Sequence, residues 1–268
     1  MPALTPLAAR PPFFVKDGAW LVATEHTRGP WSKDHQHGGP PCALLARAAE
    51  ELLPSMEVAR VSCELLKPVP IGRVRVEAEV EKPGRKAAVV RARLLASTAG
   101  GDVTCMDARL GCVRVAEVGA ATLVHAPAPA APASCEPFSF SFFPWEVGYH
   151  TAFEGRLGRG VFGRGSMGMW MRQLGALVEG EEPSPAQRVL VVADAGSGVS
   201  LGLDPRRFSF VNADLSVHMH RAARGAWIML DASTWTTGNG RGMADTAILD
   251  VDGLLGRAAQ TLIVEARA

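Results

Sequence analysis

The chain repeats one order of segments twice, and this repetition limits its fold more than any other feature. In each half, a strand-like region and a helix-like region precede four further strand-like segments bounded by turn residues. The turn residues follow the same order in both halves: Lys67-Pro68, Ile71-Gly72, Gly84-Arg85 and Gly101-Asp102, then His220-Arg221, Arg224-Gly225, Gly240-Arg241 and Asp252-Gly253. Such correspondence over a long period predicts an internal duplication.

Hydrophobic periodicity predicts the individual elements. In the first half we expect a strand at 13–23 broken by a turn, a helix at 42–53 after two prolines, and strands at 58–69, 73–82, 86–97 and 103–115. In the second half we expect strands near 149–157 and 167–174, a helix at 185–195, and strands at 208–221, 226–237, 242–250 and 254–266. Alternation of apolar and charged residues within these strands predicts two antiparallel meanders with one buried face. In this register Arg109 is the counterpart of Gln260.

A segment rich in alanine and proline separates the two halves. Residues 117–137 have no hydrophobic periodicity, which is typical of a semi-rigid connector. We therefore expect an N-terminal domain at 1–116, a linker at 117–137 and a C-terminal domain at 138–268.

Composition excludes several classes of partner. The 268 residues are 47% hydrophobic and 21% charged, with a formal net charge of +1, so nothing recruits nucleic acid or an anionic membrane. No stretch approaches about 20 apolar residues, and the proline-broken N-terminus does not resemble a signal peptide. The five cysteines form no Cys-x-x-Cys pair, which favours reduced thiols. These features predict a cytoplasmic protein without a metal or other cofactor.

Asp194 is the first candidate for chemistry. It follows the run 189–193, which is apolar on every side and therefore predicts a fully buried helix. A carboxylate at the edge of such a helix must find hydrogen bonds or have its pKa raised. The alternative to a catalytic role is a carboxylate held by the local backbone of 195–198.

The strand that follows this helix is expected to bring Asn212 close to Asp194. Within it, Val211, Ala213, Leu215, Val217 and Met219 point one way, and Asn212, Asp214, Ser216, His218 and His220 the other. His218 and His220 have a possible metal-ligand spacing but no third ligand nearby, so we do not expect a metal site. Ser197 follows a helix rather than a strand, which argues against a nucleophile elbow.

The turn His37-Gly38-Gly39 lies where the first helix is expected to begin. Glycines there allow a ligand to approach the backbone, and the free N–H groups favour a partial negative charge such as a polarised carbonyl oxygen. The alternative is an N-cap turn in which the glycines are needed only for its shape.

The order and spacing of a set of residues along the chain carry a resemblance to a known family. They are His37-Gly38-Gly39-Pro40, residues 64–72, Asp194, residues 218–221, Trp227, Gly240-Arg241-Gly242, Asp252-Gly253 and Ala259-Gln260. With them the sequence resembles the double-hotdog acyl-CoA thioesterases of the TesB-like, or thioesterase-like, superfamily.

The resemblance implies an α+β fold, a tandem double hotdog in which each half wraps an antiparallel sheet around a central helix. It also implies a homo-oligomer, because hotdog proteins commonly associate through their sheets. In that family an aspartate, a threonine or serine, and a glutamine hold the catalytic water. These positions fall on Asp194, Asn212 and Gln260, with Asn212 departing from the pattern.

These residues bear on three possible functions. Hydrolysis of acyl-CoA thioesters would use Asp194 as the base, Asn212 and Gln260 as amides that orient water, and the His37-Gly38-Gly39 turn as oxyanion donor and substrate site. A non-catalytic acyl or hydrophobic-ligand binding protein is the alternative, favoured by Asn212. A hotdog hydratase would need a histidine about five residues after the aspartate, where this chain has Val199.

Overall fold

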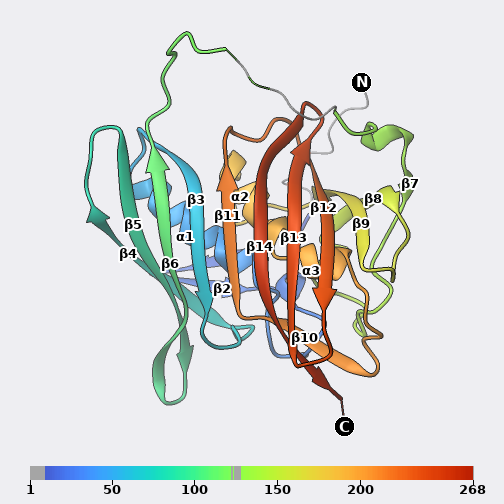
Figure 1. The fold of residues 1–268 in the computed structure, drawn as a ribbon. Coiled ribbons are helices and arrows are strands. Elements are labelled where there is room, and N and C mark those ends of the chain that lie inside the picture. Colours follow the sequence, from blue (N-terminus) through green and yellow to red (C-terminus); the bar gives the residue numbers. More distant parts are fainter. Residues whose placement is uncertain (1–9, 122, 124–127, 268) are drawn as a thin grey trace.

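A computed structural model describes residues 10–121, 123 and 128–267 (Figure 1). The first half contains β1 (Phe14–Asp17), β2 (Trp20–Ala23), α1 (Gly39–Leu52), β3 (Glu57–Leu65), β4 (Arg73–Lys82), β5 (Ala87–Thr98) and β6 (Gly101–Val113). The second contains β7 (Glu136–Pro137), β8 (Phe153–Gly160), β9 (Ser166–Gln173), α2 (Pro185–Ala193), α3 (Gly196–Val199), β10 (Phe208–Asn212), β11 (Asp214–Met219), β12 (Trp227–Thr236), β13 (Arg241–Asp250) and β14 (Gly253–Ala266). Short 3-10 helices occupy Glu25–Thr27, Pro132–Ser134 and Tyr149–Thr151.

All paired strands belong to one 14-stranded sheet. The strand order is β1-β2-β4-β5-β6-β3-β11-β14-β13-β12-β9-β8-β7, and β10 also pairs with β14. Every pair of these strands is antiparallel, which confirms the predicted sense of the strands. The order of β2-β4-β5-β6-β3 mirrors that of β9-β12-β13-β14-β11 about the central β3–β11 pair.

The prediction of four-strand meanders is wrong at its first strand. β3 pairs with β6 and β11, not with the next strand along the chain, and β11 likewise pairs with β14 and β3. Only β4-β5-β6 and β12-β13-β14 are meanders. Local periodicity defines each strand but not its neighbour, because pairing depends on contacts that are distant in sequence.

The two long helices pack against each other on one face of the sheet (Figure 1). Both begin with proline in the first turn, where the missing N–H costs no helical hydrogen bond. α1 buries Cys42–Ala46 almost completely, and α2 buries Val189–Ala193. The all-round burial predicted for the second helix is therefore confirmed, although α2 ends at Ala193 and a separate turn of helix, α3, follows.

The expected correspondence between Arg109 and Gln260 is not found. Arg109 lies on the outer face of β6 and pairs with Glu81 at 2.8 Å, whereas Gln260 points into the core and is 1% exposed. Arg109 pairs with Ser62, Ser62 pairs with Ser216, and Ser216 pairs with Ala259. The repeat register was thus displaced by one residue, which reverses the face of the sheet.

Within the part of the chain that the structure describes, no helix combines the length and the apolar character needed to cross a membrane.

Candidate active site

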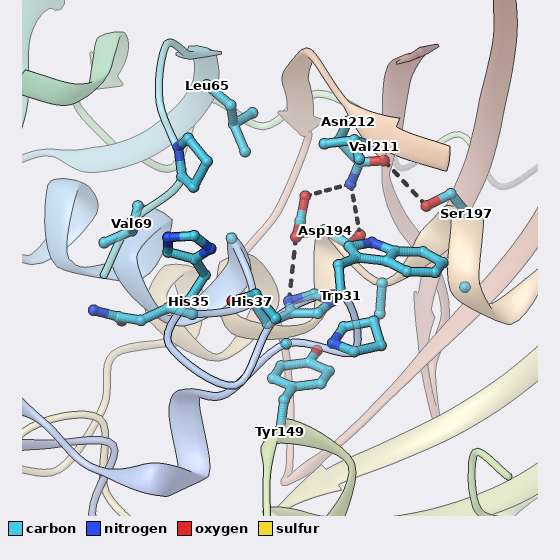
Figure 2. A pocket seen from close by; sticks show the side chains of 18 of the residues that line it. Trp31, His35, His37, Leu65, Val69, Tyr149, Asp194, Ser197, Val211 and Asn212 are labelled. Atoms are coloured by element: carbon cyan, nitrogen blue, oxygen red, sulfur yellow. Dashed lines mark hydrogen bonds and ion pairs between the residues drawn. The ribbon is translucent and has the colours of Figure 1, made fainter. Parts of the chain in front are cut away.

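A mostly apolar pocket of about 270 Å³ lies where the start of α1 meets the end of α2 and the end of β10 (Figure 2). His37 and Gly38 reach it from the first half of the chain, and Asp194, Ser197 and Asn212 from the second. Its apolar wall consists mainly of Trp31, Leu65, Val69, Phe140, Phe142, Phe143, Tyr149, Phe210 and Val211. The pocket therefore joins a few polar groups to a large hydrophobic surface, as ligand sites commonly do.

Asp194 ends α2 and is 4% exposed. Its Oδ1 accepts hydrogen bonds from Asn212 Nδ2 at 2.7 Å and from Gln260 Nε2 at 3.2 Å. The same two amides donate to the Asp194 carbonyl oxygen, at 3.2 and 2.9 Å. The structure thus brings Asp194, Asn212 and Gln260 together, although Gln260 lies behind the pocket wall and does not line it.

Ser197 fixes the orientation of both amides. Its Oγ donates to Asn212 Oδ1 at 3.1 Å, and its backbone N–H donates to Gln260 Oε1 at 3.2 Å. Because each amide oxygen already accepts a hydrogen bond from Ser197, each NH₂ group faces Asp194. The sequence pattern around Ser197 indicates only whether it could be a nucleophile, because this arrangement depends on the fold of three separate segments.

A β-bulge at Ala213 turns Asn212 toward the pocket. Asn212 pairs with Leu262, and Ser216 pairs with Ala259. The chain therefore advances four residues from Asn212 to Ser216 while β14 advances only three, which leaves one extra residue between β10 and β11. Strict alternation over 208–221 predicted Asn212 and Asp214 on one face. Instead, Asn212 faces Asp194, while Asp214 binds Thr261 on the exposed side, and Val211 is 46% exposed. The extra residue reverses the face of the strand after Asn212.

His37 lies on the other side of the carboxylate. Its Nδ1 is 3.2 Å from Asp194 Oδ2 and also 3.2 Å from the Gly39 nitrogen. The first contact needs a proton on Nδ1 and the second a lone pair there, so the tautomer decides which one forms. Burial lowers the pKa of His37 below its usual 6.5, and this effect outweighs the Asp194 charge, which raises the pKa. The lowered pKa favours the neutral ring.

Tyr149 supports the His37 ring from below. The two rings are stacked with centroids 3.7 Å apart, and the tyrosine hydroxyl donates to the Val191 carbonyl at 2.9 Å. Burial, together with the Asp194 charge, raises the pKa of Tyr149 well above its usual 10, so the hydroxyl keeps its proton.

The two glycines at the start of α1 have different surroundings. Gly38 lines the pocket, and a Cβ added to it would lie 2.8 Å from Asp194 Oδ2. Gly39 does not line the pocket, and a Cβ there would overlap the Val191 carbonyl oxygen of α2. Prolines 40 and 41 carry no N–H, and in the described chain the Gly38 N–H has no acceptor. Gly38 is thus the free donor at this helix end.

The aromatic wall was not anticipated. Trp31 lines the pocket edge-on to Phe210, with ring centroids 4.8 Å apart. Phe140, Phe142 and Phe143 come from the irregular segment after the linker, whose closely spaced phenylalanines were the available signal. His218 and His220 lie outside the pocket, and the described residues contain no cluster of three or more His, Cys, Asp or Glu side chains suited to a metal.

Two family models together match most of the chain. Models of the acyl-CoA thioesterase N-terminal domain and C-terminal domain match residues 27–113 and 132–264. No curated protein matches the chain.

Several solved structures share the fold at low sequence identity. A hotdog-fold protein of unknown function from Alicyclobacillus acidocaldarius has a TM-score of 0.73 at 14% identity, covering 95% of this chain and 96% of that one. The tesB protein of Mycobacterium avium subsp. paratuberculosis has a TM-score of 0.68 at 18% identity, covering 94% and 95%. An acyl-CoA thioesterase II from Mycobacterium marinum has a TM-score of 0.66 at 14% identity, covering 94% of both chains. The hotdog fold is common to all of them.

Proposed function

The chain belongs to the acyl-CoA thioesterase family, and from this premise we propose that it hydrolyses acyl-CoA thioesters with Asp194 as the base that activates water. One observation carries the proposal. A buried carboxylate, held by two oriented amides, faces an apolar pocket beside a free backbone N–H group. Thioester hydrolysis needs this combination of a base, orienting groups and an oxyanion donor.

Each group has a separate task in the proposed reaction. Asn212 and Gln260 occupy Oδ1 of Asp194. When His37 Nδ1 accepts the Gly39 N–H, Oδ2 has no donor from His37 and accepts a proton from water. The resulting hydroxide attacks the thioester carbonyl carbon, and the carbonyl oxygen, now anionic, accepts the Gly38 N–H. The C–S bond then breaks, the carbonyl re-forms, and the thiolate leaves with the proton returned from Asp194.

We further propose a tandem of two hotdog units, with residues 1–116 and 138–268 as the units and 117–137 as the linker. The mirrored strand order about β3 and β11 supports two equivalent units. The end of the linker packs on the second unit, because Glu136 and Pro137 pair with β8 and Trp170 donates to the Ala130 carbonyl.

A binding protein without catalysis is the second candidate. Asn212 stands where the family has a hydroxyl. Its amide is hydrogen-bonded to both Asp194 and Ser197, so it occupies positions that a water molecule could otherwise take. On this hypothesis the pocket holds an acyl group and Asp194 is structural.

The substitution Asp194→Asn separates the two candidates. It preserves shape and removes the proton acceptor, so we expect turnover to fall by at least about a thousandfold, measured by release of free thiol from a panel of acyl-CoAs. Binding of an acyl-CoA, measured by calorimetry, should persist. Equal background rates for the wild type and the variant on every substrate would reject the hydrolase and favour the binding protein.

A further inference from the structure

Three exposed arginines gather where β10 begins and β14 ends. Arg206 and Arg207 form the turn that enters β10, and Arg267 follows β14. The Arg267 N–H donates to the Arg207 carbonyl at 2.8 Å, so the backbone holds the two segments together. Asp204 shapes the turn, with its Oδ1 accepting the Arg206 backbone N–H at 2.9 Å.

None of the three guanidinium groups has a carboxylate within 4.0 Å among the described residues. In contrast, several arginines on the outer face of the first half are paired, as Arg75 is with Asp102 at 3.0 Å and Arg91 with Asp107 at 2.6 Å. The cluster is therefore an uncompensated positive surface, even with Asp204 and Glu265 nearby. Such a surface suits a ligand with several phosphate charges.

Trp31 connects the cluster to the pocket. The Arg267 guanidinium carbon lies 5.2 Å from the centre of the Trp31 ring, and Trp31 lines the pocket. Arg207 lies 5.6 Å from the ring centre of Phe208, two residues before the pocket residue Phe210. The arginines thus border the same side of the pocket that Trp31 covers.

Strand β10 gives the distance between the carboxylate site and the arginines. Asn212, at the carboxylate, is five residues from Arg207, roughly 16 Å at the usual rise of about 3.3 Å per residue. The pantetheine arm of coenzyme A has about thirteen bonds between sulfur and diphosphate, equal to about four extended residues or roughly 15 Å. A thioester at Asp194 whose arm runs along β10 would therefore place its phosphates beside Arg207.

We infer that Arg206, Arg207 and Arg267 form a phosphate subsite that binds the nucleotide end of coenzyme A. This inference rests on the proposed function, since it takes the thioester to lie at Asp194. It also predicts selectivity among substrates. The enzyme would favour an acyl group carried on coenzyme A over the same group on a short thiol without phosphates.

Kinetics with two matched substrates test the subsite. The substrates are an acyl-CoA and the same acyl group on N-acetylcysteamine, which lacks the phosphates. Arg207→Gln and Arg267→Gln should each raise the ratio of KM for the acyl-CoA to KM for the short thioester about tenfold. A triple variant, with Arg206→Gln added to both, should raise this ratio further. Added salt should weaken wild-type binding of the acyl-CoA selectively. Arg85→Gln, at an exposed arginine in the β4–β5 turn, is the control and should leave the KM ratio unchanged.

A variant KM ratio equal to that of the wild type would overturn the subsite. If that unchanged ratio came with an equal rise in KM for both substrates, the arginines would act only through Trp31. If the wild type hydrolyses neither substrate, the proposed function fails. Calorimetric titration with coenzyme A alone then tests the subsite separately, and unchanged affinity in the triple variant would reject it.

Discussion

Ser197 determines which end of each amide, the oxygen or the NH₂ group, points toward Asp194. An isolated Asn or Gln side chain can present either its oxygen or its NH₂ group, and an oxygen turned toward the carboxylate would repel it. The Ser197 Oγ and N–H each occupy one amide oxygen. The carboxylate consequently receives donors from both amides, and these hydrogen bonds replace the water that Asp194 loses on burial.

The substitution Ser197→Ala removes the Oγ–Asn212 hydrogen bond and leaves Asn212 Oδ1 without its donor. We expect kcat to fall about tenfold while the fold persists, because one hydrogen bond that positions the amide is lost. Ser200→Ala is the matched control, since its hydroxyl binds the Gly196 carbonyl and Thr234 away from the amides. A similar fall in kcat for both variants would show that the effect comes from disruption of the helix α3 and not from the orientation of Asn212.

Alanine substitutions at the adjacent residues Gly38 and Gly39 should have different effects, one on activity and the other on stability. In Gly39→Ala the new methyl group overlaps the Val191 carbonyl of α2, so we expect unfolding free energy to fall by about 3 kcal/mol in urea titrations. In Gly38→Ala the methyl group meets the end of the Asp194 side chain, which can shift, so kcat should fall about a hundredfold with less loss of stability. Equal losses of stability in the two variants would contradict this division.

At the scale of elements, the bulge at Ala213 places Asn212. A regular strand through 208–219 that keeps Leu215 and Val217 in the core would point Asn212 away from Asp194. One extra residue lets the strand present Phe210 and Asn212 to the pocket and still bury Leu215 and Val217.

Deleting Ala213 should therefore exchange the residue that faces Asp194. If β11 keeps its pairing, Val211 replaces Asn212 at the pocket, and we expect kcat to fall by at least about a hundredfold with an intact fold, checked by circular dichroism. Restoring the amide at this place, by adding Val211→Asn to the deletion, should recover much of the loss. Failure of this rescue in a folded double variant would show that the bulge has another role.

Sequence patterns predicted the elements better than their connections. Both long helices and the strand segments follow from proline placement, apolar periodicity and turn residues, which act over a few neighbours. The place of β3 beside β6, the bulge at Ala213 and the role of Ser197 depend on contacts between distant segments. The helix and the strand after it predicted that Asn212 lies close to Asp194, and the family resemblance added Gln260, whereas alternation grouped Asn212 with Asp214 on one face of the strand, which is wrong.

At the scale of the whole molecule, the site lies between the two halves. His37 and Gly38 come from the first half, while Asp194, Asn212 and Gln260 come from the second. The sheet is continuous across β3 and β11, with pairs from Asp214–Glu64 to His218–Arg60. A relative shift of the halves would therefore change the His37–Asp194 distance directly.

Other contacts also join the halves. Phe13 and Phe14 donate backbone hydrogen bonds to Ala176 and Leu177, at 3.0 Å each, so the start of β1 binds the second half while β1 pairs with β2 in the first. Between α1 and α2, Glu50 accepts hydrogen bonds at 2.7 Å from Ser184 and from Gln187. Neither half could keep its core covered if the other unfolded.

We consequently expect the chain to unfold in one cooperative transition, although its sequence contains two similar halves. Calorimetry should give equal calorimetric and van't Hoff enthalpies, and urea transitions followed by tryptophan fluorescence and circular dichroism should coincide. The variant Gly39→Ala provides a sharper form of the experiment, because its clash at Val191 lies between α1 and α2. This variant should lower the midpoint of the unfolding transition, and the transition should remain single. Two resolved transitions, in the wild type or in this variant, would show that the halves are independent units and that the site between them can open while each half remains folded.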